Sequence, residues 1–330
     1  MSYASFVARR GAFAVVAAFL VVSVTFLVAA AVPNAQLGAK IAAAQREGAS
    51  QEELREIREN FWERRGGKPG LLERYVDYLA GMVTLDLGTS WSLQEPVADV
   101  VAKRLPYTLA YVVPGVLLSF VTGTLLGVAG AFRRDGLFDR GVRVVAYLAM
   151  GLPAFWLVHY LDTVHPWTLP WTVPSRVIVS VSSGVSPLWS FDHPLRYVWP
   201  TLVLSLGLVA ALLQHARAEA LEYERAQFVK LLEAKGASRL RVARHVVRNA
   251  AVPILTLSFV EVLGVLMLNV YIIESVFRIP GLGLISLYAI EHQDVPLVLG
   301  TTMVLVFIGI GGSLLQDLLY GYLDPTVGEN

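Results

Sequence analysis

The chain has 330 residues, of which 55% are hydrophobic and only 16% are charged. With a mean hydropathy of +0.57, this composition lies outside the range of ordinary soluble domains and indicates a membrane protein. The formal net charge of +1 gives no general affinity for nucleic acid, and the absence of cysteine excludes disulfides, thiolate metal sites and cysteine nucleophiles.

Six stretches are apolar and long enough to cross a bilayer, since a spanning helix needs about 20 largely apolar residues. They are residues 11–32, 107–132, 142–161, 197–214, 250–273 and 297–319. The first follows Arg9 and Arg10, as a secretory signal would, but its apolar run exceeds the roughly 7 to 15 residues of a signal core. We therefore predict an all-α, polytopic membrane protein in which residues 1–33 form a retained first transmembrane helix.

The remaining chain divides into two parts. Residues 34–106 are polar, with the charge alternation of exposed helices, and are predicted to form an extracytoplasmic helical insertion. Residues 107–330 form the membrane core. Lys and Arg are concentrated at the N-terminus, in 133–143 and in 217–248, and short cytoplasmic loops carry such an excess. Alternation of the spans then makes both termini cytoplasmic.

Residues 218–249 form a basic loop between the fourth and fifth spans. Phe228, Leu231 and Leu232 recur at the i, i+3, i+4 spacing of an amphipathic helix. Gly236 is suited to the left-handed stop of that helix, and Ser238 to the cap of the next one. The pattern therefore predicts a helix, a glycine turn and a second, short helix, which we call the elbow.

Several interpretations compete for this loop. A basic amphipathic helix also lies on anionic lipid, and this interpretation stays open. A helix-turn-helix DNA reader is disfavoured, because two flanking spans prevent it from entering a groove. A simple connector is disfavoured as well, since connections in compact domains usually run about 2 to 8 residues. A loop of this length is typical of a surface that docks a partner.

The loop contains Lys235-Gly236, His245, Arg248-Asn249-Ala250 and Val252-Pro253. In this order, these residues resemble the cytoplasmic loop of ABC-importer permeases, specifically the dipeptide, oligopeptide and nickel permease group. Further segments resemble that group in the same order, namely residues 74–79, 86–90, 104–109, 151–157, 274–283, 294–296 and 317–325. Lys230-Leu231-Leu232 departs from the broader superfamily, which has Glu-Ala-Ala at this place.

The resemblance implies the type I ABC importer permease fold with six transmembrane helices, in a multi-pass protein of the cell membrane. It implies a permease subunit of an ATP-driven importer of di- or oligopeptides. The implied partners are a second homologous permease, two cytoplasmic ABC ATPase subunits, an extracytoplasmic solute-binding protein and membrane lipid, without nucleic acid. The implied ATPase-docking residues are Phe228, Leu231, Leu232, Ala234, Lys235, Gly236, Ala237, Ser238, His245 and Arg248.

No phosphate-binding loop occurs in the sequence. The nearest approach to one, Gly66-Gly67-Lys68-Pro69, lacks both the first glycine and the hydroxyl residue of that motif. We therefore expect no catalytic residue and no cofactor bound by this chain, with ATP and magnesium on the partner ATPase.

Polar residues within the apolar segments are candidates for the translocation path. Glu261 lies inside the fifth span, where a charge is costly, and we place it on this path together with Asn269. A paired packing role for Glu261 is equally compatible with its position. The turn after the fifth span is expected to shape an outer gate and to bind no ligand; its candidate residues are Glu274, Pro280, Gly281 and Gly283.

Two further hypotheses concern polar residues near the membrane boundary. His159, Asp162 and His165 have ligand chemistry, but three scattered residues at such a boundary are more often hydrogen-bonding, so we expect no metal site. A gradient-driven secondary transporter or channel would use Glu261, Asp162 or His159 as a proton relay. The sequence is also compatible with an importer of the same family that carries nickel or another small solute, and with a structural membrane anchor.

Overall fold

The computed structural model describes residues 3–31, 35–63, 70–153, 156–157, 160 and 194–323. Within these ranges the regular structure is helical, apart from one isolated bridge between Thr89 and Pro96. The helices are α1 (Tyr3–Ala31), α2 (Ala35–Arg46), α3 (Gln51–Glu63), α4 (Leu71–Thr84), α5 (Val97–Ala131), α6 (Leu137–Gly151), η3 (Pro194–Tyr197), α8 (Val198–Glu224), α9 (Gln227–Ala234), α10 (Arg239–Phe277), α11 (Leu282–Glu291) and α12 (Val295–Leu323).

The chain forms two compact units that do not follow its order. The first comprises residues 1–14, 104–285 and 307–330, and the second comprises residues 15–103 and 286–306. This division differs from the predicted division into a first helix, an insertion and a core, because long helices such as α1 and α12 contribute to both units.

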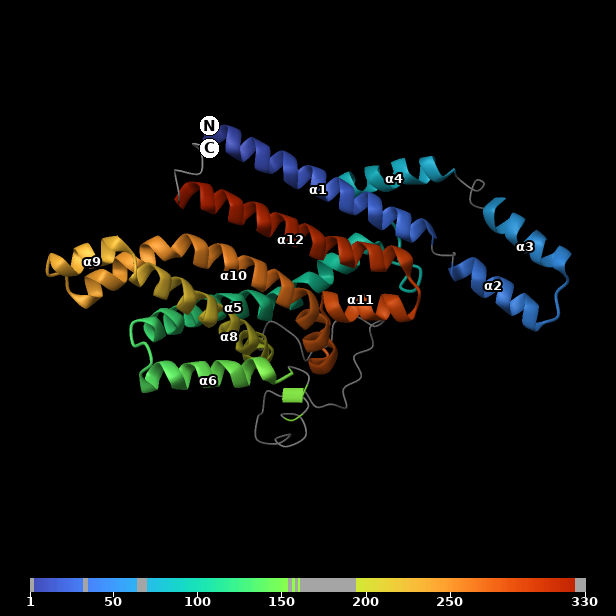
Figure 1. Ribbon diagram of the computed structural model, residues 1–330. Helices are drawn as coiled ribbons and strands as arrows, with labels where there is room; N and C mark the ends of the chain where they lie inside the picture. Colours follow the sequence, from blue (N-terminus) through green and yellow to red (C-terminus); the bar gives the residue numbers. More distant parts are fainter. Residues whose placement is uncertain are drawn as a thin grey trace. The chain divides into compact units, whose positions relative to one another are not determined.

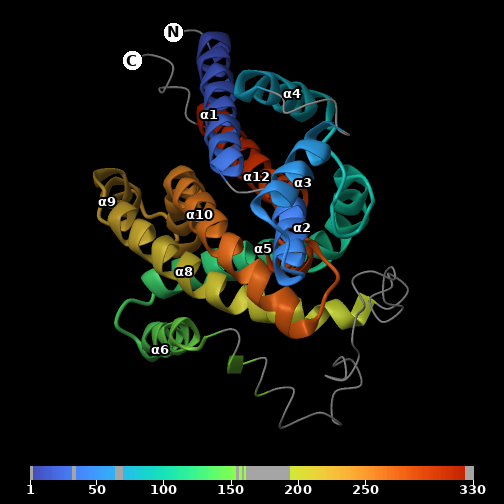
Figure 2. The same ribbon diagram turned by 90° about the vertical axis from the view of Figure 1, so that its right-hand side faces the viewer.

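The first unit is a bundle in which α8 lies between α6 and α10 (Figures 1 and 2). Helix α5 packs tightly against α8 where Gly123 and Gly127 lie at a four-residue spacing. A Cβ at Gly127 would come within 2.9 Å of the Ala216 Cβ, and one at Gly123 within 2.7 Å of the Leu212 Cβ. Because these two positions carry no side chain, the backbones of α5 and α8 approach closely, as small residues allow in membrane helices.

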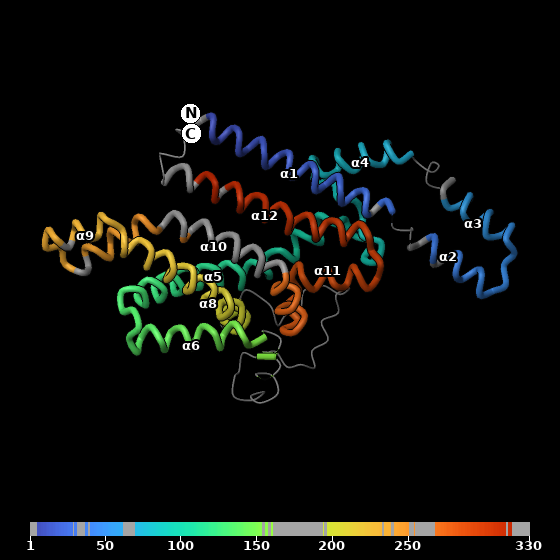
Figure 3. Tube along the Cα trace, in the orientation of Figure 1, coloured from blue at the N-terminus to red at the C-terminus, as the bar shows by residue number. Residues whose placement is uncertain are grey.

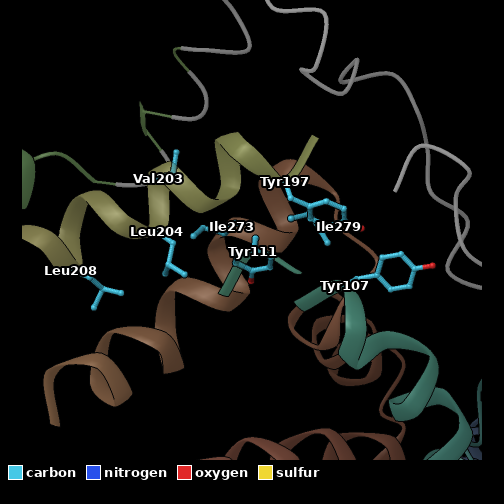
Figure 4. Close-up of a cluster of buried hydrophobic side chains, with 8 residues drawn as sticks. All are labelled: Tyr107, Tyr111, Tyr197, Val203, Leu204, Leu208, Ile273 and Ile279. Atoms are coloured by element: carbon cyan, nitrogen blue, oxygen red, sulfur yellow. The ribbon is translucent and has the colours of Figure 1, made fainter. Parts of the chain in front are cut away.

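A buried apolar cluster joins α5, α8 and α10 in the first unit. Tyr111 from α5, Leu204 and Leu208 from α8, and Ile273 from α10 are each at most 2% exposed, and Figure 4 shows them converging. In the same unit, Arg10 Nη1 donates to the Asp317 Oδ2 (3.1 Å) and joins the beginning of α1 to the end of α12.

The second unit contains the insertion. Helices α2 and α3 form a hairpin that buries Leu54 and Phe61, and Figure 3 shows the trace reversing between them. Helix α4 places Tyr75 against α1, where its hydroxyl lies 2.6 Å from the Ser23 Oγ and its ring 5.2 Å from that of Phe26. This part of the predicted helical insertion is therefore helical, and it packs on a neighbouring helix.

Four helices are long and apolar enough to cross a membrane in the described part of the chain. Their apolar stretches are Ser5–Val28, Val97–Ala131, Val198–Glu224 and Val295–Leu318. A fifth candidate is a pair of helical segments, Leu268–Phe277 and Leu282–Glu291, bent by 87°.

The helices differ from the predicted spans at their ends. Helix α5 begins ten residues before the predicted second span, at Val97, and α6 ends at Gly151, where Leu152 is extended before Pro153. The rest of the predicted third span lies largely outside the described residues, as do His159, Asp162 and His165.

Candidate functional site

The elbow begins with α9, a short helix that ends in the predicted left-handed glycine. Gly236 has φ +76°, and the amide of Ala237 donates to the Leu232 carbonyl (3.0 Å), while that of Lys235 donates to the Leu231 carbonyl (3.1 Å). The bond from Ala237 to Leu232 is the 6→1 bond of a Schellman ending, which satisfies carbonyls that the helix leaves open. Ser238 stands at the N-cap of α10, as predicted, with extended backbone and no side-chain hydrogen bond to the helix.

The inner face of the elbow packs on α5 and α8. Val229, Val242 and Val246 are buried in a cluster with residues from the end of α5 and the end of α8, and Phe228, Leu232 and Ala237 lie half-buried against it. The cluster partners are Val128 and Ala131 from α5 and Ala220 from α8. Any displacement of the elbow therefore acts directly on two long helices of the first unit.

The outer face of the elbow is exposed. Leu231 is 56% exposed although it is a large apolar residue. The other exposed residues of the predicted docking set are Ala234, Lys235, Gly236, Ser238, His245 and Arg248. The exposed set therefore combines one large apolar side chain with two cations, Lys235 and Arg248.

One prediction for the elbow is wrong. The helix after Gly236 is not short, because α10 continues from Arg239 through Pro253 to Phe277 without interruption. The reason is a continuous buried stripe at four-residue spacing, formed by Val242, Val246, Ala250 and Ile254. This stripe keeps one helix face on α5 and α8 across the predicted boundary.

A buried ion pair joins α6 to α8 near the elbow. Asp139 is fully buried, and Arg217 forms a bidentate contact with it. Arg217 Nε donates to Asp139 Oδ1 (2.6 Å), and Nη2 donates to Oδ2 (2.8 Å). The backbone amide of Asp135 also donates to Asp139 Oδ2 (3.1 Å). The hydrogen bonds from Arg217 lower the pKa of Asp139 and outweigh its burial, which raises the pKa. The sequence prediction missed this pair.

At the far end of α10, the predicted outer-gate residues do come together. Glu274 is fully buried; its Oε1 accepts hydrogen bonds from the hydroxyls of Thr108 (2.6 Å) and Tyr111 (3.2 Å), and its Oε2 accepts one from the amide of Leu284 (3.0 Å). The Thr108 hydroxyl in turn accepts from the amide of Leu282 (2.8 Å). Glu274 thus fastens α5 to the beginning of α11.

The turn between α10 and α11 fits closely around this carboxylate. Pro280, Gly281 and Gly283 are buried, and a Cβ at Gly281 would overlap the Glu274 carboxylate and the Thr108 hydroxyl. Arg278 ends α10 in the left-handed region with φ 55°. These contacts assign the three residues a structural part in the bend, while their part in a gate stays a prediction.

Of the two candidate path residues, the structure describes the side chain of Asn269 only. Glu261 belongs to α10, but its side chain lies outside the described part of the structure. Asn269 lies half-buried on the same helix.

In the second unit, Asp294 joins two segments that are far apart in sequence. Its Oδ2 accepts hydrogen bonds from the hydroxyls of Ser90 and Ser92 (both 2.6 Å) and from the amide of Ser92 (2.9 Å), and its Oδ1 caps α12 through the amide of Leu297 (3.2 Å). Burial raises the pKa of Asp294, but these hydrogen bonds outweigh it and keep the pKa below its ordinary value. Both segments are among those that resemble the peptide and nickel permeases.

Comparison with known proteins places this arrangement in a family. Residues 123–329 match the family described as binding-protein-dependent transport system inner membrane component, and this range includes the elbow and the bend at Glu274. A peptide transport system permease protein of Brucella abortus, named as putative, is 32% identical over 255 residues, which cover 76% of this chain and 78% of the relative.

Two further relatives are similar over the same extent. The dipeptide transport system permease protein DppB of Bacillus subtilis is 28% identical over 78% of this chain and 79% of its own length. The metal-staphylopine import system permease protein CntB of Staphylococcus aureus is 27% identical over 81% of each chain. The protein therefore belongs to the family of binding-protein-dependent transport system inner membrane components.

Proposed function

We propose that this permease subunit imports di- or oligopeptides. The peptide assignment rests on the similarity to two relatives named for peptide and dipeptide transport, over about three quarters of each chain. We assign the energy source to a separate pair of cytoplasmic ATPases, which bind ATP and magnesium, and the delivery of cargo to an extracytoplasmic binding protein. A second homologous permease completes the path.

We propose the elbow as the ATPase-docking surface. Its exposed residues include Leu231, Lys235 and Arg248, and its inner face packs on α5 and α8 through Val229, Val242 and Val246. When the ATPases close on ATP, the elbow moves with them and shifts these helices, which changes the side from which the path is open. The packing of the elbow on α5 and α8 thereby couples ATPase docking to the opening of the path.

Uptake into proteoliposomes tests this function. The complete transporter, with its binding protein and a labelled dipeptide, should accumulate cargo when ATP is supplied to the ATPase side, and a complex whose ATPase binds but cannot hydrolyse ATP should not. Accumulation that continues without hydrolysis and follows an imposed proton gradient would contradict an ATP-driven importer and favour a secondary transporter.

A metal chelate is the second candidate cargo, because one relative is named for the import of a metal-staphylopine complex. The same vesicles distinguish the two: a chelated metal in excess should leave dipeptide uptake unchanged if peptides are the cargo. Uptake of the chelate, with no uptake of the dipeptide itself, would replace the peptide assignment.

We also keep Glu261 and Asn269 as proposed path residues. Glu261→Leu should reduce uptake while leaving the amount of assembled transporter unchanged. Unaltered uptake would remove Glu261 from the path.

A further inference from the structure

An apolar groove of about 350 Å³ lies between α5, α6 and α8 in the first unit. Its lining is made of aliphatic and aromatic side chains and one glycine, with Leu137, Phe138 and Val145 on the α6 side and Leu206 and Leu213 on the α8 side. The volume falls in the range of ligand sites, about 300 to 1,000 Å³. Val145 is 64% exposed and Leu137 is 89% exposed, so the groove opens to the outside of the unit.

Positive charge stands at one end of this groove. The guanidinium carbon of Arg133 lies 4.8 Å from the ring centroid of Phe138, which lines the groove. Arg140 is exposed and follows Leu137 by three residues, the spacing of neighbours on a helix surface. The two acids of this segment are both paired, Asp139 with Arg217 and Asp135 with Arg134. The turn between α5 and α6 therefore keeps a positive surface.

We propose that this groove binds one acyl chain of an anionic phospholipid, whose headgroup phosphate is held by Arg133 and Arg140. The protein belongs to an inner-membrane family, and α5 is a candidate membrane-spanning helix that ends at Ala131. We therefore expect Arg133, in the following turn, and Arg140, in the first turn of α6, to lie near a membrane surface. Charge complementarity selects the occupant, since basic sites next to membrane helices bind anionic headgroups. The inference is independent of the proposed cargo.

Gly141 keeps the groove open and provides a clean test. A Cβ at this position meets no atom within 4 Å, and Gly141 lines the groove, so a larger side chain has room to begin there. Replacing glycine inside a helix also favours the helix. Gly207 on α8 is a matched control, because a Cβ there likewise meets no atom within 4 Å and Gly207 does not line the groove.

The experiment is native mass spectrometry of the complete, delipidated transporter titrated with phosphatidylglycerol or phosphatidylcholine of identical acyl chains. The unaltered transporter should retain phosphatidylglycerol in preference to phosphatidylcholine. Gly141→Phe should lower the apparent affinity for phosphatidylglycerol by about tenfold or more, whereas Gly207→Phe should not.

The headgroup is tested separately. The double variant Arg133→Gln and Arg140→Gln should lose the preference for phosphatidylglycerol, by about tenfold or more, and still bind both lipids weakly. Arg225→Gln with Arg244→Gln removes two arginines elsewhere and should keep the preference.

Three results would overturn the proposal. Equal phosphatidylglycerol binding by Gly141→Phe and Gly207→Phe would show that the groove holds no lipid. An unchanged headgroup preference in the Arg133 and Arg140 variant would show that these arginines do not select it. Loss of pairing with the second permease in Gly141→Phe, with lipid binding intact, would make the groove a protein interface.

Discussion

Asp139 is an acidic residue in an environment that is unusual for its type. It is completely buried, and its charge is kept by the bidentate contact with Arg217, which comes from another helix. Removing one partner of such a pair leaves the other buried and uncompensated, which costs more than the pair contributes when it is intact.

Asp139→Asn is therefore expected to destabilise the protein by about 3 kcal/mol. Denaturant unfolding of the purified protein measures this change. Asp135→Asn is the matched control: Asp135 is 65% exposed in its ion pair with Arg134, and its loss should cost less than about 1 kcal/mol. Similar stabilities for the two variants would contradict the role assigned to Asp139.

The same residue predicts a dependence on pH. Because the pKa of Asp139 is lowered by folding, its contribution is present above the ordinary carboxyl pKa and is lost as the pH falls through the lowered value. Unfolding followed from neutral to acid pH should show a smaller loss of stability in Asp139→Asn than in the unaltered protein. Parallel curves would count against this linkage.

Some of these residues were predictable from their type and others were not. Gly236 was predicted because glycine tolerates a positive φ, which is a property of the residue itself. The contact between Asp139 and Arg217 joins positions 78 apart, and that between Thr108 and Glu274 joins positions 166 apart. No local pattern pairs such residues, so the sequence placed Glu274 at the bend but not its partners.

The elbow is an element whose form the sequence predicted in part. Helix α9, the glycine turn and the cap position agree with the prediction, since each depends on a few adjacent residues. The predicted length of the second helix was wrong, because a loop ending at residue 249 and a span beginning at 250 were expected, whereas the buried stripe from Val242 to Ile254 continues one helix through this point. Tertiary packing here overrides a local signal.

Gly236→Val is expected to separate the elbow from the ATPase. A β-branched residue at a positive φ costs about 1 to 3 kcal/mol, so α9 would leave its position while the long helices remain packed. Co-purification of the ATPase subunits with the tagged permease should fall severalfold, and uptake should fall with it.

Gly48→Val is the control for this change. Gly48 also has a positive φ, of 84°, and open space around it, but it lies in the turn between α2 and α3. ATPase co-purification should be retained in Gly48→Val. If Gly236→Val keeps both the ATPase and uptake, the docking assignment is wrong.

For the molecule as a whole, composition and hydropathy predicted the all-helical membrane fold, and the family match agrees with it. The division into two compact units was not predicted, because residues 286–306 join the unit that contains the insertion through contacts such as that of Asp294 with Ser90. Chain order alone does not contain this information.

The orientation of the whole protein is testable because the chain has no cysteine. We expect Lys235→Cys to react with a membrane-impermeant maleimide in inverted vesicles only, since the elbow is predicted to be cytoplasmic. Glu56→Cys, on the exposed face of α3, should react in right-side-out vesicles only. Labelling of both positions from the same side would overturn the predicted topology.

The uninterrupted course of α10 has a mechanical consequence. Its 39 residues correspond to a contour of about 58 Å, and no loop divides the cap at Ser238 from the last turn that carries Glu274. No loop relieves strain along this helix, so its two ends shift together or the helix itself bends, and Pro253, which has no amide hydrogen, is the position that favours bending. Force applied at Ser238 would then reach Glu274 along one helix, with no intervening loop.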